Sequence, residues 1–207
     1  MNRWLDKNLG SGRRALDVGC GTGRYTVMLA DRYDDVVGID VAPTMIEIAE
    51  RDRLRPNIRY QTRDVLSLRP EHDGRFDLVL ALGCVVNVGP PKLVLGHLRN
   101  LVAKGGTLLL MEAMWEPGWG SRDWQVNFAF RTARAVWNAT GDLEDVAAAL
   151  QVVLHPTWLE MAGVAVPLAR EDFLQEYSAA LPGVIIEEGC ERLGLEVFAV
   201  SWRAADE

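Results

Sequence analysis

Residues 1–110 alternate short apolar runs with longer stretches whose apolar residues have helical spacing. The apolar runs are Ala15–Val18, Val36–Ile39, Ile58–Gln61, Phe76–Leu82 and Thr107–Met111. Between them lie stretches that can each hold a helix, namely Gly23–Tyr33, Pro43–Arg53 and Pro91–Val102, the last ended by Gly105-Gly106. Strands that alternate with helices form parallel sheets, because each helix returns the chain to the same edge of the sheet. The pattern therefore predicts an α/β fold built on a parallel sheet.

The alternation stops after the fifth run, because residues 112–182 contain far more chain than one crossover helix requires. Helical spacing predicts two inserted helices, at Arg122–Ala139 and at Leu143–Leu154, the second closed before a proline. A crossover helix is then expected at Arg170–Ala180. The segment 115–168 is therefore expected to be a helical insertion after the fifth strand, rich in aromatic residues, that caps the substrate.

The last part of the chain returns to short alternating runs. Val184–Glu187 and Leu195–Trp202 lie on either side of Gly189 and Gly194. Two such runs predict an antiparallel pair of strands that completes the sheet. Residues 1–207 are therefore expected to form a single domain.

Composition limits the partners that this domain can have. The chain has 22 Lys and Arg against 29 Asp and Glu, and the net charge of −7 disfavours the phosphate backbone of nucleic acids. Cys20, Cys84 and Cys190 lie far apart, so their spacing predicts neither a disulfide framework nor a metal site. No apolar stretch reaches the ~18 residues of a membrane span, and the first residues do not resemble a signal peptide. We therefore expect a cytoplasmic protein with no metal, no nucleic-acid partner and no membrane partner.

The strongest local motif runs from Leu16 to Tyr25 and reads Leu-Asp-Val-Gly-Cys-Gly-Thr-Gly-Arg-Tyr. Its glycines, Gly19, Gly21 and Gly23, follow a predicted strand and precede a predicted helix. Glycine adopts backbone torsions barred to other residues and lets a ligand approach the main chain closely. A tight turn alone would also use glycines, but the acidic residues nearby favour a ligand site.

The spacing of these glycines differs from that of a dinucleotide site. Such a site reads G-x-G-x-x-G and holds a pyrophosphate at the helix N-terminus. Here the pattern is G-x-G-x-G, and Arg24 stands where the third glycine of a dinucleotide site would fall. Asp17, two residues before the first glycine, would repel a pyrophosphate but attract a cationic group. The turn therefore favours a ligand with an ammonium group and an adenosine over NAD.

Two further aspartates follow the next two predicted strands. Asp40 ends the second run and Asp64 comes shortly after the third, so that successive aspartates are one βα unit apart. The three carboxylates are expected at the carboxyl edge of the sheet, where open α/β sheets bind ligands. Singly, each would fit a helix cap or a turn. Together they predict that Asp40 accepts hydrogen bonds from ribose hydroxyls and Asp64 from an adenine amine.

These motifs resemble those of the class I S-adenosylmethionine-dependent methyltransferases. The resemblance runs through Leu16–Arg24, Val36–Met45, Asp64-Val65, Phe76–Val88 and Leu101–Glu112, about half of the chain. It implies S-adenosyl-L-methionine as cofactor and a Rossmann-like, seven-stranded, mostly parallel sheet with an antiparallel last strand. It also implies cofactor-binding roles for Asp17, Gly19, Gly21 and Gly23 beside the methionine, Asp40 at the ribose, Ala42, Met45, Asp64 and Val65 around the adenine, and Leu82 and Gly83 along the methionine arm.

The segment after the fourth run bears on the acceptor. Methyltransferases that act on nucleobase or amide nitrogens often carry Asp/Asn-Pro-Pro-aromatic there, whereas this chain has its prolines later, at Pro90 and Pro91. Together with the acidic balance, this favours a small-molecule acceptor, methylated at oxygen or nitrogen by in-line displacement. Protein or peptide methylation, and a non-catalytic S-adenosylmethionine-binding module, are the alternatives.

Candidate catalytic residues come from three places in the chain. Glu112 ends the fifth run, Asn87 follows the fourth, and His155 lies in the insertion. Each has a side chain that can orient an acceptor or exchange a proton with it. A base is needed only where the acceptor holds its proton at neutral pH.

The insertion is rich in tryptophan. Trp115 and Trp119, just after the fifth run, are the candidates to line the acceptor pocket. Trp124, Phe128 and Trp137 are expected instead to pack the inserted helices onto the sheet. The contact surface of a homodimer is a third use for the same segment.

Overall fold

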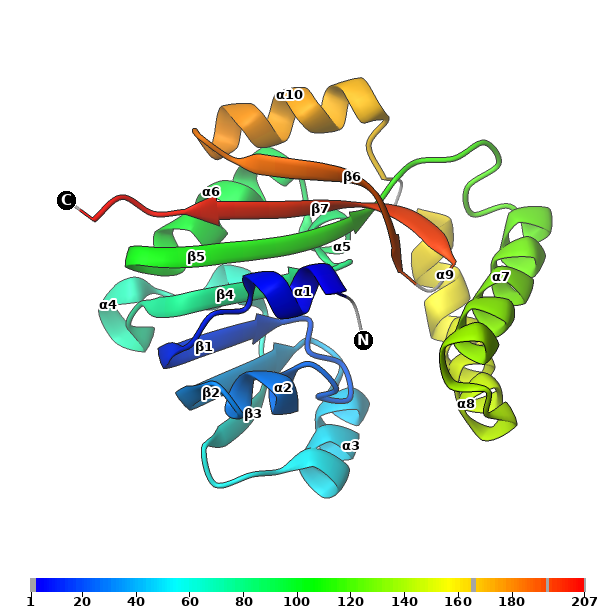
Figure 1. Ribbon diagram of the computed structural model, residues 1–207, viewed down its shortest axis with the longest axis horizontal. Helices are drawn as coiled ribbons and strands as arrows, with labels where there is room; N and C mark the ends of the chain where they lie inside the picture. Colours follow the sequence, from blue (N-terminus) through cyan, green and yellow to red (C-terminus); the bar gives the residue numbers. More distant parts are fainter. Residues whose placement is uncertain (1–2, 165–166, 193, 207) are drawn as a thin grey trace.

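The computed structural model describes residues 3–164, 167–192 and 194–206 (Figure 1). The strands in these ranges are β1 (Gly12–Val18), β2 (Tyr33–Asp40), β3 (Ile58–Thr62), β4 (Phe76–Leu82), β5 (Val102–Ala113), β6 (Ile185–Arg192) and β7 (Leu195–Arg203). The helices are α1 (Arg3–Asn8), α2 (Thr26–Ala30), α3 (Pro43–Arg53), α4 (Pro70–Asp73), α5 (Val85–Val88), α6 (Pro91–Leu101), α7 (Arg122–Thr140), α8 (Leu143–Val153), α9 (Pro156–Val164) and α10 (Arg170–Ala180), with a 3₁₀ helix at Val65–Ser67.

The strands form one sheet in the order β3-β2-β1-β4-β5-β7-β6. The pairs β1–β2, β1–β4, β2–β3 and β4–β5 are parallel. β7 runs antiparallel to both of its neighbours, β5 and β6. The sheet confirms the predicted mostly parallel architecture with an antiparallel last strand. Because β1 lies between β2 and β4, the strand order reverses there, and open sheets bind ligands at the carboxyl end of such a position.

Helices cover both faces of the sheet. α6 and α10 bury their apolar residues in one core cluster, whereas α1, α2 and α3 contribute to a second cluster on the other face. β4 divides between the two: Val79 and Ala81 belong to the first cluster, and Leu78 and Leu80 to the second. Successive side chains of a strand point to opposite faces, so a strand covered on both faces needs a nearly continuous apolar sequence.

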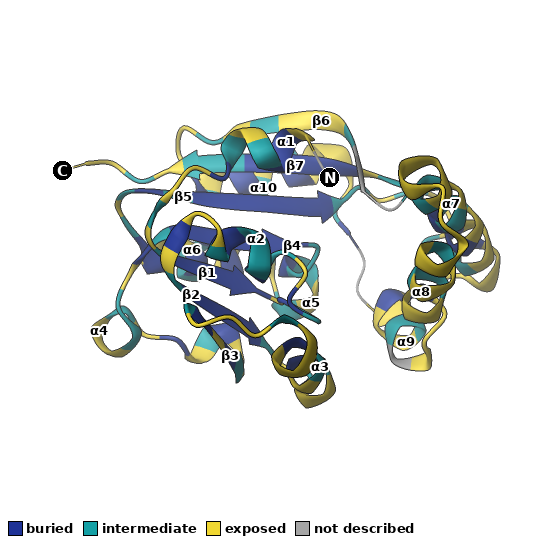
Figure 2. Cartoon of the chain, turned by 60° about the horizontal axis from the view of Figure 1, so that its bottom comes forward, coloured by how far each residue is buried: buried dark blue, intermediate teal, exposed yellow. Residues whose placement is uncertain are grey.

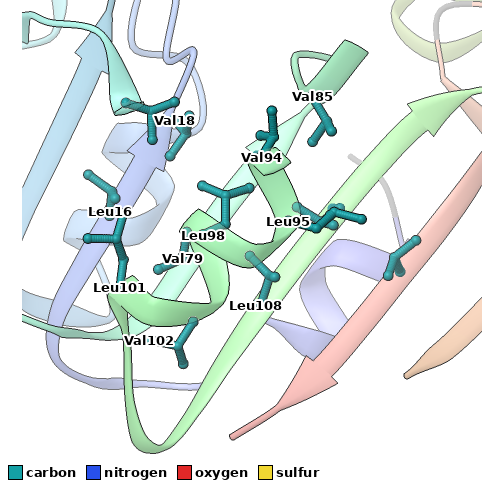
Figure 3. Packing of buried hydrophobic residues seen from close by; sticks show 14 of the residues in the cluster. Leu16, Val18, Val79, Val85, Val94, Leu95, Leu98, Leu101, Val102 and Leu108 are labelled. Atoms are coloured by element: carbon teal, nitrogen blue, oxygen red, sulfur yellow. The ribbon is translucent and has the colours of Figure 1, made fainter. Parts of the chain in front are cut away.

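α6 illustrates how its sequence produces the packing. Its first residue is Pro91, at a position where a missing N–H group costs nothing. Val94, Leu95, Leu98 and Leu101 are spaced three and four residues apart, and all four are buried against the sheet (Figure 3). This spacing places them on one stripe of the helix.

Two elements of the sheet region differ from the sequence-based expectation. The glycine turn continues through Tyr25, so α2 is shorter than the helix expected at 23–33. Gly105 and Gly106 do not end a helix; they lie inside β5, where the pairing with β4 shifts register. A Cβ atom on Gly106 would lie 3.0 Å from the carbonyl oxygen of Asp77, so glycine is what allows the two backbones to approach at this bulge.

The insertion forms α7, α8 and α9 beyond the carboxyl edge of the sheet, as both ribbon views show (Figures 1 and 2). α7 and α8 confirm the two predicted helices. α9 was not predicted, because Pro156 was expected only to close the preceding helix. Proline is equally suited to the first turn of a new helix, and Pro156 is the first residue of α9.

The insertion has a small hydrophobic cluster of its own. The rings of Trp124 and Phe128 stack with centroids 5.2 Å apart, and Phe128 stacks on Trp158 at 5.0 Å. Leu195, the first residue of β7, packs against the same cluster, so Trp124 and Phe128 join the inserted helices both to one another and to the edge of the sheet. The expectation is wrong for Trp137, which is 47% exposed. In the described part of the chain, no helix is both long and apolar enough to span a membrane.

Candidate functional site

The glycine turn leaves β1 at the carboxyl edge of the sheet, and its glycines meet different surroundings. Gly19, Gly21 and Gly23 all have positive φ, at 65°, 53° and 81°. A Cβ atom on Gly23 would lie 2.3 Å from the hydroxyl oxygen of Tyr60, and one on Gly19 would lie 3.0 Å from Cβ of Cys84. On Gly21 it would meet no atom within 4 Å. Two of the glycines are thus required by packing, whereas the third leaves open backbone at the edge of the sheet.

Asp40, the last residue of β2, holds this turn in place. One oxygen of its carboxylate accepts a hydrogen bond from the backbone N–H of Gly21 at 2.9 Å. The other accepts from the backbone N–H of Ala42, also at 2.9 Å, immediately before α3 begins. An ionised carboxylate has about four lone-pair sites, so two remain after these bonds. Asp40 is therefore equipped to accept from a pair of hydroxyl groups.

Asp17 lies beneath the turn, near the end of β1. Its side chain is 3% exposed and accepts a hydrogen bond from the hydroxyl of Thr26 at 2.6 Å. The thiol of Cys20 is also buried. Burial raises the pKa of Cys20, and the nearby carboxylates of Asp17 and Asp40 raise it further. The thiol therefore stays protonated at neutral pH, in keeping with a small packing residue inside the turn.

Asp64 follows β3 at the same edge of the sheet and is exposed. It caps the 3₁₀ helix, because one carboxylate oxygen accepts from the backbone N–H of Leu66 at 2.9 Å. Val65, next to it, is buried in the core, and Ala42 and Met45 at the start of α3 are half-buried. Asp64 thus caps a helix, as an isolated aspartate often does. Its second carboxylate oxygen lies at the carboxyl edge of the sheet and makes no bond to this helix.

The segment after β4 lies against the glycine turn. Gly83, at φ 71°, donates its N–H to the carbonyl of Met111 at 2.6 Å, which ties the end of β4 to β5. Leu82 before it is buried. Asn87, on α5, is exposed and donates its side-chain amide to the carbonyl of Gly83 at 3.3 Å. The structure therefore brings Asn87 to the segment that was expected to line the methionine arm.

Glu112 is located at the end of β5, as expected, but its side chain is 1% exposed. Its carboxylate accepts from the backbone N–H groups of Cys84 and Val85, at 3.3 and 3.2 Å. These N–H groups open α5, so Glu112 holds the first turn of that helix.

The remaining candidates lie on or next to the insertion. His155 is exposed at the junction of α8 and α9. Trp115 is 44% exposed in the segment between β5 and α7. Trp119 is half-buried: its indole N–H donates to the carbonyl of Ala162 at 3.1 Å, and its ring lies 4.3 Å from that of Trp124. These residues thus lie on or beside the insertion, whereas Asp17, Asp40 and Asp64 lie near the ends of β1, β2 and β3, and Trp119 packs within the insertion.

Two residues of the site were missed from the sequence. Thr26 donates to Asp17, and Tyr60 forms the wall behind Gly23. A threonine in the first turn of a helix and a tyrosine at a buried position of a strand are both common, so neither carries a signal until the strands are placed side by side.

Comparisons with known proteins find methyltransferases. A family model described as a methyltransferase domain matches residues 15–106. The ubiquinone biosynthesis O-methyltransferase of Psychrobacter cryohalolentis is 34% identical over 104 residues, which are 48% of this chain and 40% of that protein. The malonyl-[acyl-carrier protein] O-methyltransferase of a Paenibacillus species is 32% identical over 102 residues, 46% of this chain and 37% of that protein. The chain thus spans less than half the length of these curated relatives.

Solved structures match a larger share of the chain. The N-methyltransferase NodS from Bradyrhizobium japonicum WM9 gives a TM-score of 0.61 at 16% identity, and the match covers 97% of this chain and 89% of that chain. NodS in complex with S-adenosyl-L-homocysteine gives a TM-score of 0.58 at 17% identity, with 97% and 81% covered. At such identities the likeness concerns the fold.

Proposed function

We propose that the protein transfers a methyl group from S-adenosylmethionine to the oxygen or nitrogen of a small molecule, because residues 15–106 match the model of a methyltransferase domain and the O-methyltransferases described above are similar to the same part of the chain. The observation that carries the proposal is the arrangement of Asp40 and Gly21. The carboxylate of Asp40 fixes both sides of an open backbone segment and keeps acceptor sites for two hydroxyl groups.

The residues present fit this cofactor. A cationic nucleoside needs carboxylates and close access to backbone, and this edge of the sheet has Asp17, Asp40 and Asp64 around a glycine with nothing within 4 Å of its Cβ position. Asp40 would hold the ribose and Asp64 the adenine amine, while Asp17 would favour the positively charged methionine end. Gly83 would border the methionine arm.

S-adenosylmethionine supplies a methyl group on a positively charged sulfur, which is already activated for displacement. The chain therefore has mainly to align the acceptor and keep water away. Gly83 and Asn87, held together at 3.3 Å, are placed to orient the acceptor beside the methionine arm. The insertion beyond the carboxyl edge, with Trp115 exposed on the segment that leads to it, would form the acceptor side of the site. If the acceptor must lose a proton, Asn87 would position the acceptor, and the exposed imidazole of His155 is the candidate to take the proton.

An assay with isotopically labelled S-adenosylmethionine tests the proposal directly. The purified protein would be incubated with a panel of phenols, amines and carboxylic acids, and with a basic peptide. We expect label in at least one small molecule and none in the peptide. Label in the peptide alone would contradict the small-molecule acceptor. Tight binding of S-adenosylhomocysteine without transfer to any acceptor would favour a non-catalytic binding module.

Glu112 is better suited to positioning than to proton transfer, because its carboxylate is buried and bonded to the start of α5. Glu112→Ala leaves the N–H groups of Cys84 and Val85 without this acceptor, and we expect it to lower the free energy of unfolding by about 2 kcal/mol. Glu112→Gln keeps an acceptor oxygen, so most of the stability and turnover should remain. Urea unfolding and the labelled-methyl assay measure the two effects. A Glu112→Gln protein that is stable but has lost its turnover would instead identify Glu112 as a proton acceptor.

A further inference from the structure

The insertion exposes an unusual amount of apolar surface. Most of the large hydrophobic side chains that the described residues leave exposed lie on its helices or at their ends. They are Val126, Phe130, Trp137, Leu143, Val152, Leu154, Met161 and Val164. Soluble proteins rarely leave such a concentration uncovered unless it is an interaction surface.

On α7 these side chains form a ridge. Val126, Phe130 and Trp137 are 54%, 72% and 47% exposed, and their spacing of four and seven residues places them on one face of the helix. Trp124 and Phe128, which are buried in the cluster of the insertion, lie on the opposite face. α7 is therefore apolar on two sides, of which only one is covered by its own chain.

The junction of α8 and α9 forms a hollow. It is shallow and open to solvent, has a volume of about 720 Å³ and is lined mainly by apolar side chains: Ala147, Leu150, Gln151, Leu154, His155 and Pro156. The ridge on α7 and the hollow at the α8–α9 junction belong to the same three-helix insertion. One copy of the chain therefore has both a protruding and a receding apolar surface.

The charges beside these two surfaces are opposite. Arg122 and Arg134 are exposed on α7, four residues from Val126 and from Phe130 respectively, and so flank the ridge. Asp123, three residues before Val126, is exposed there too, so the charge beside the ridge is net positive. α8 contains Glu144 and Asp145 and no lysine or arginine. A lipid surface would not suit this combination, since the anionic head groups that attract α7 would repel α8.

From this complementarity we propose that a second copy of the chain covers the insertion, with the ridge of α7 in the α8–α9 hollow of its partner. In a two-fold dimer the contact occurs twice, because each copy offers both surfaces to the other. The two arginines of one copy then lie on the acidic side of the other, and they outnumber Asp123 on the same ridge.

The exposed area is of the size that such a contact needs. With about 150–250 Å² for a large side chain, the exposed parts of Val126, Phe130, Trp137, Leu143 and Leu154 amount to roughly 500–600 Å². Stable interfaces bury about 800 Å² on each partner, of which well over half is apolar. The dimer would also fix the insertion beyond the carboxyl edge of the sheet, where the acceptor has to bind.

Analytical ultracentrifugation of the full chain across a dilution series tests the proposal. We expect twice the mass of one chain at high concentration and the monomer on dilution. Phe130→Ser truncates the ridge, and Ala147→Arg fills the hollow; each should raise the dissociation constant of the dimer by about tenfold or more. Leu54→Ser removes a leucine that is 62% exposed just after α3, away from the insertion, and should leave that constant unchanged.

Circular dichroism establishes that each variant is folded, and both test positions are exposed, so folding should be preserved. A monomer at every concentration would overturn the proposal, as would a dimer that tolerates both Phe130→Ser and Ala147→Arg. A mass that keeps growing beyond two chains would also contradict it, since it would mean an open head-to-tail contact. None of these readouts depends on methyl transfer, so they stand apart from the test of the function.

Discussion

Gly23→Ala should lower the melting temperature by roughly 6–12 °C, which corresponds to about 3 kcal/mol for a domain of this size. The added Cβ would lie 2.3 Å from the hydroxyl oxygen and 2.8 Å from Cζ of Tyr60, a side chain that is itself buried. The φ angle of 81° adds the cost of a left-handed backbone in a residue with a side chain, about 1–2 kcal/mol. Differential scanning calorimetry measures the shift.

Gly21→Ala is the matched comparison in the same turn. Its φ of 53° carries a similar backbone cost, but its Cβ would meet no protein atom within 4 Å. We therefore expect a loss of only about 1 kcal/mol in stability, together with a drop of about tenfold or more in affinity for S-adenosylhomocysteine, since the methyl group would occupy the space where the cofactor is proposed to approach the backbone. In the double variant Gly23→Ala/Tyr60→Phe, part of the lost stability should return. Equal melting temperatures for the two single variants would show that Tyr60 does not form the wall described here.

Asp40→Ala should weaken the binding of S-adenosylhomocysteine by about 100-fold or more. The carboxylate is expected to accept from two ribose hydroxyls, and hydrogen bonds to a charged group contribute about 1.5–3 kcal/mol each. The same substitution releases the N–H groups of Gly21 and Ala42, so the turn also loses its anchor. Isothermal titration calorimetry gives the affinity, and turnover in the labelled-methyl assay should fall with it.

Asp34→Ala serves as the control for this prediction. Asp34 is an exposed aspartate of the same strand, β2, near the opposite edge of the sheet, so its removal changes the net charge equally. We expect its affinity for S-adenosylhomocysteine to match that of the unmodified chain. If Asp40→Ala also left the affinity unchanged, the ribose role of Asp40 would be refuted.

The sequence alone predicted those helices and turns whose boundaries are set by residues within them. α3 and α10 begin and end where apolar spacing and proline placed them, at Pro43–Arg53 and Arg170–Ala180. The carboxyl-edge position of Asp17 and Asp40 followed from strand ends and chain spacing, because parallel strands bring their carboxyl ends to one edge. The glycine turn could also be recognised from the sequence, because residues other than glycine rarely adopt its positive φ angles.

The parts that could not be predicted depend on contacts between distant segments. That Gly23 must be glycine is decided by Tyr60 on β3, and the bulge at Gly106 by the backbone of Asp77. That Trp124 is buried whereas Trp137 is exposed depends on how three helices are arranged, which their individual patterns do not fix. Glu112 was a candidate to orient an acceptor or take its proton because its position at the end of the fifth run was known, whereas its partners, the N–H groups of Cys84 and Val85, were not.

The position of β7 has a consequence for synthesis of the protein. β7 follows β5 and β6 in the chain but lies between them in the sheet. As the polypeptide leaves the ribosome, β5 can pair with β4, but its other edge and all of β6 lack their partner strand until Leu195–Arg203 emerges. During that interval the backbone of β5 offers an unpaired edge to any neighbouring nascent chain. Aggregation during translation, rather than unfolding of the finished domain, is thus the vulnerable stage of its production.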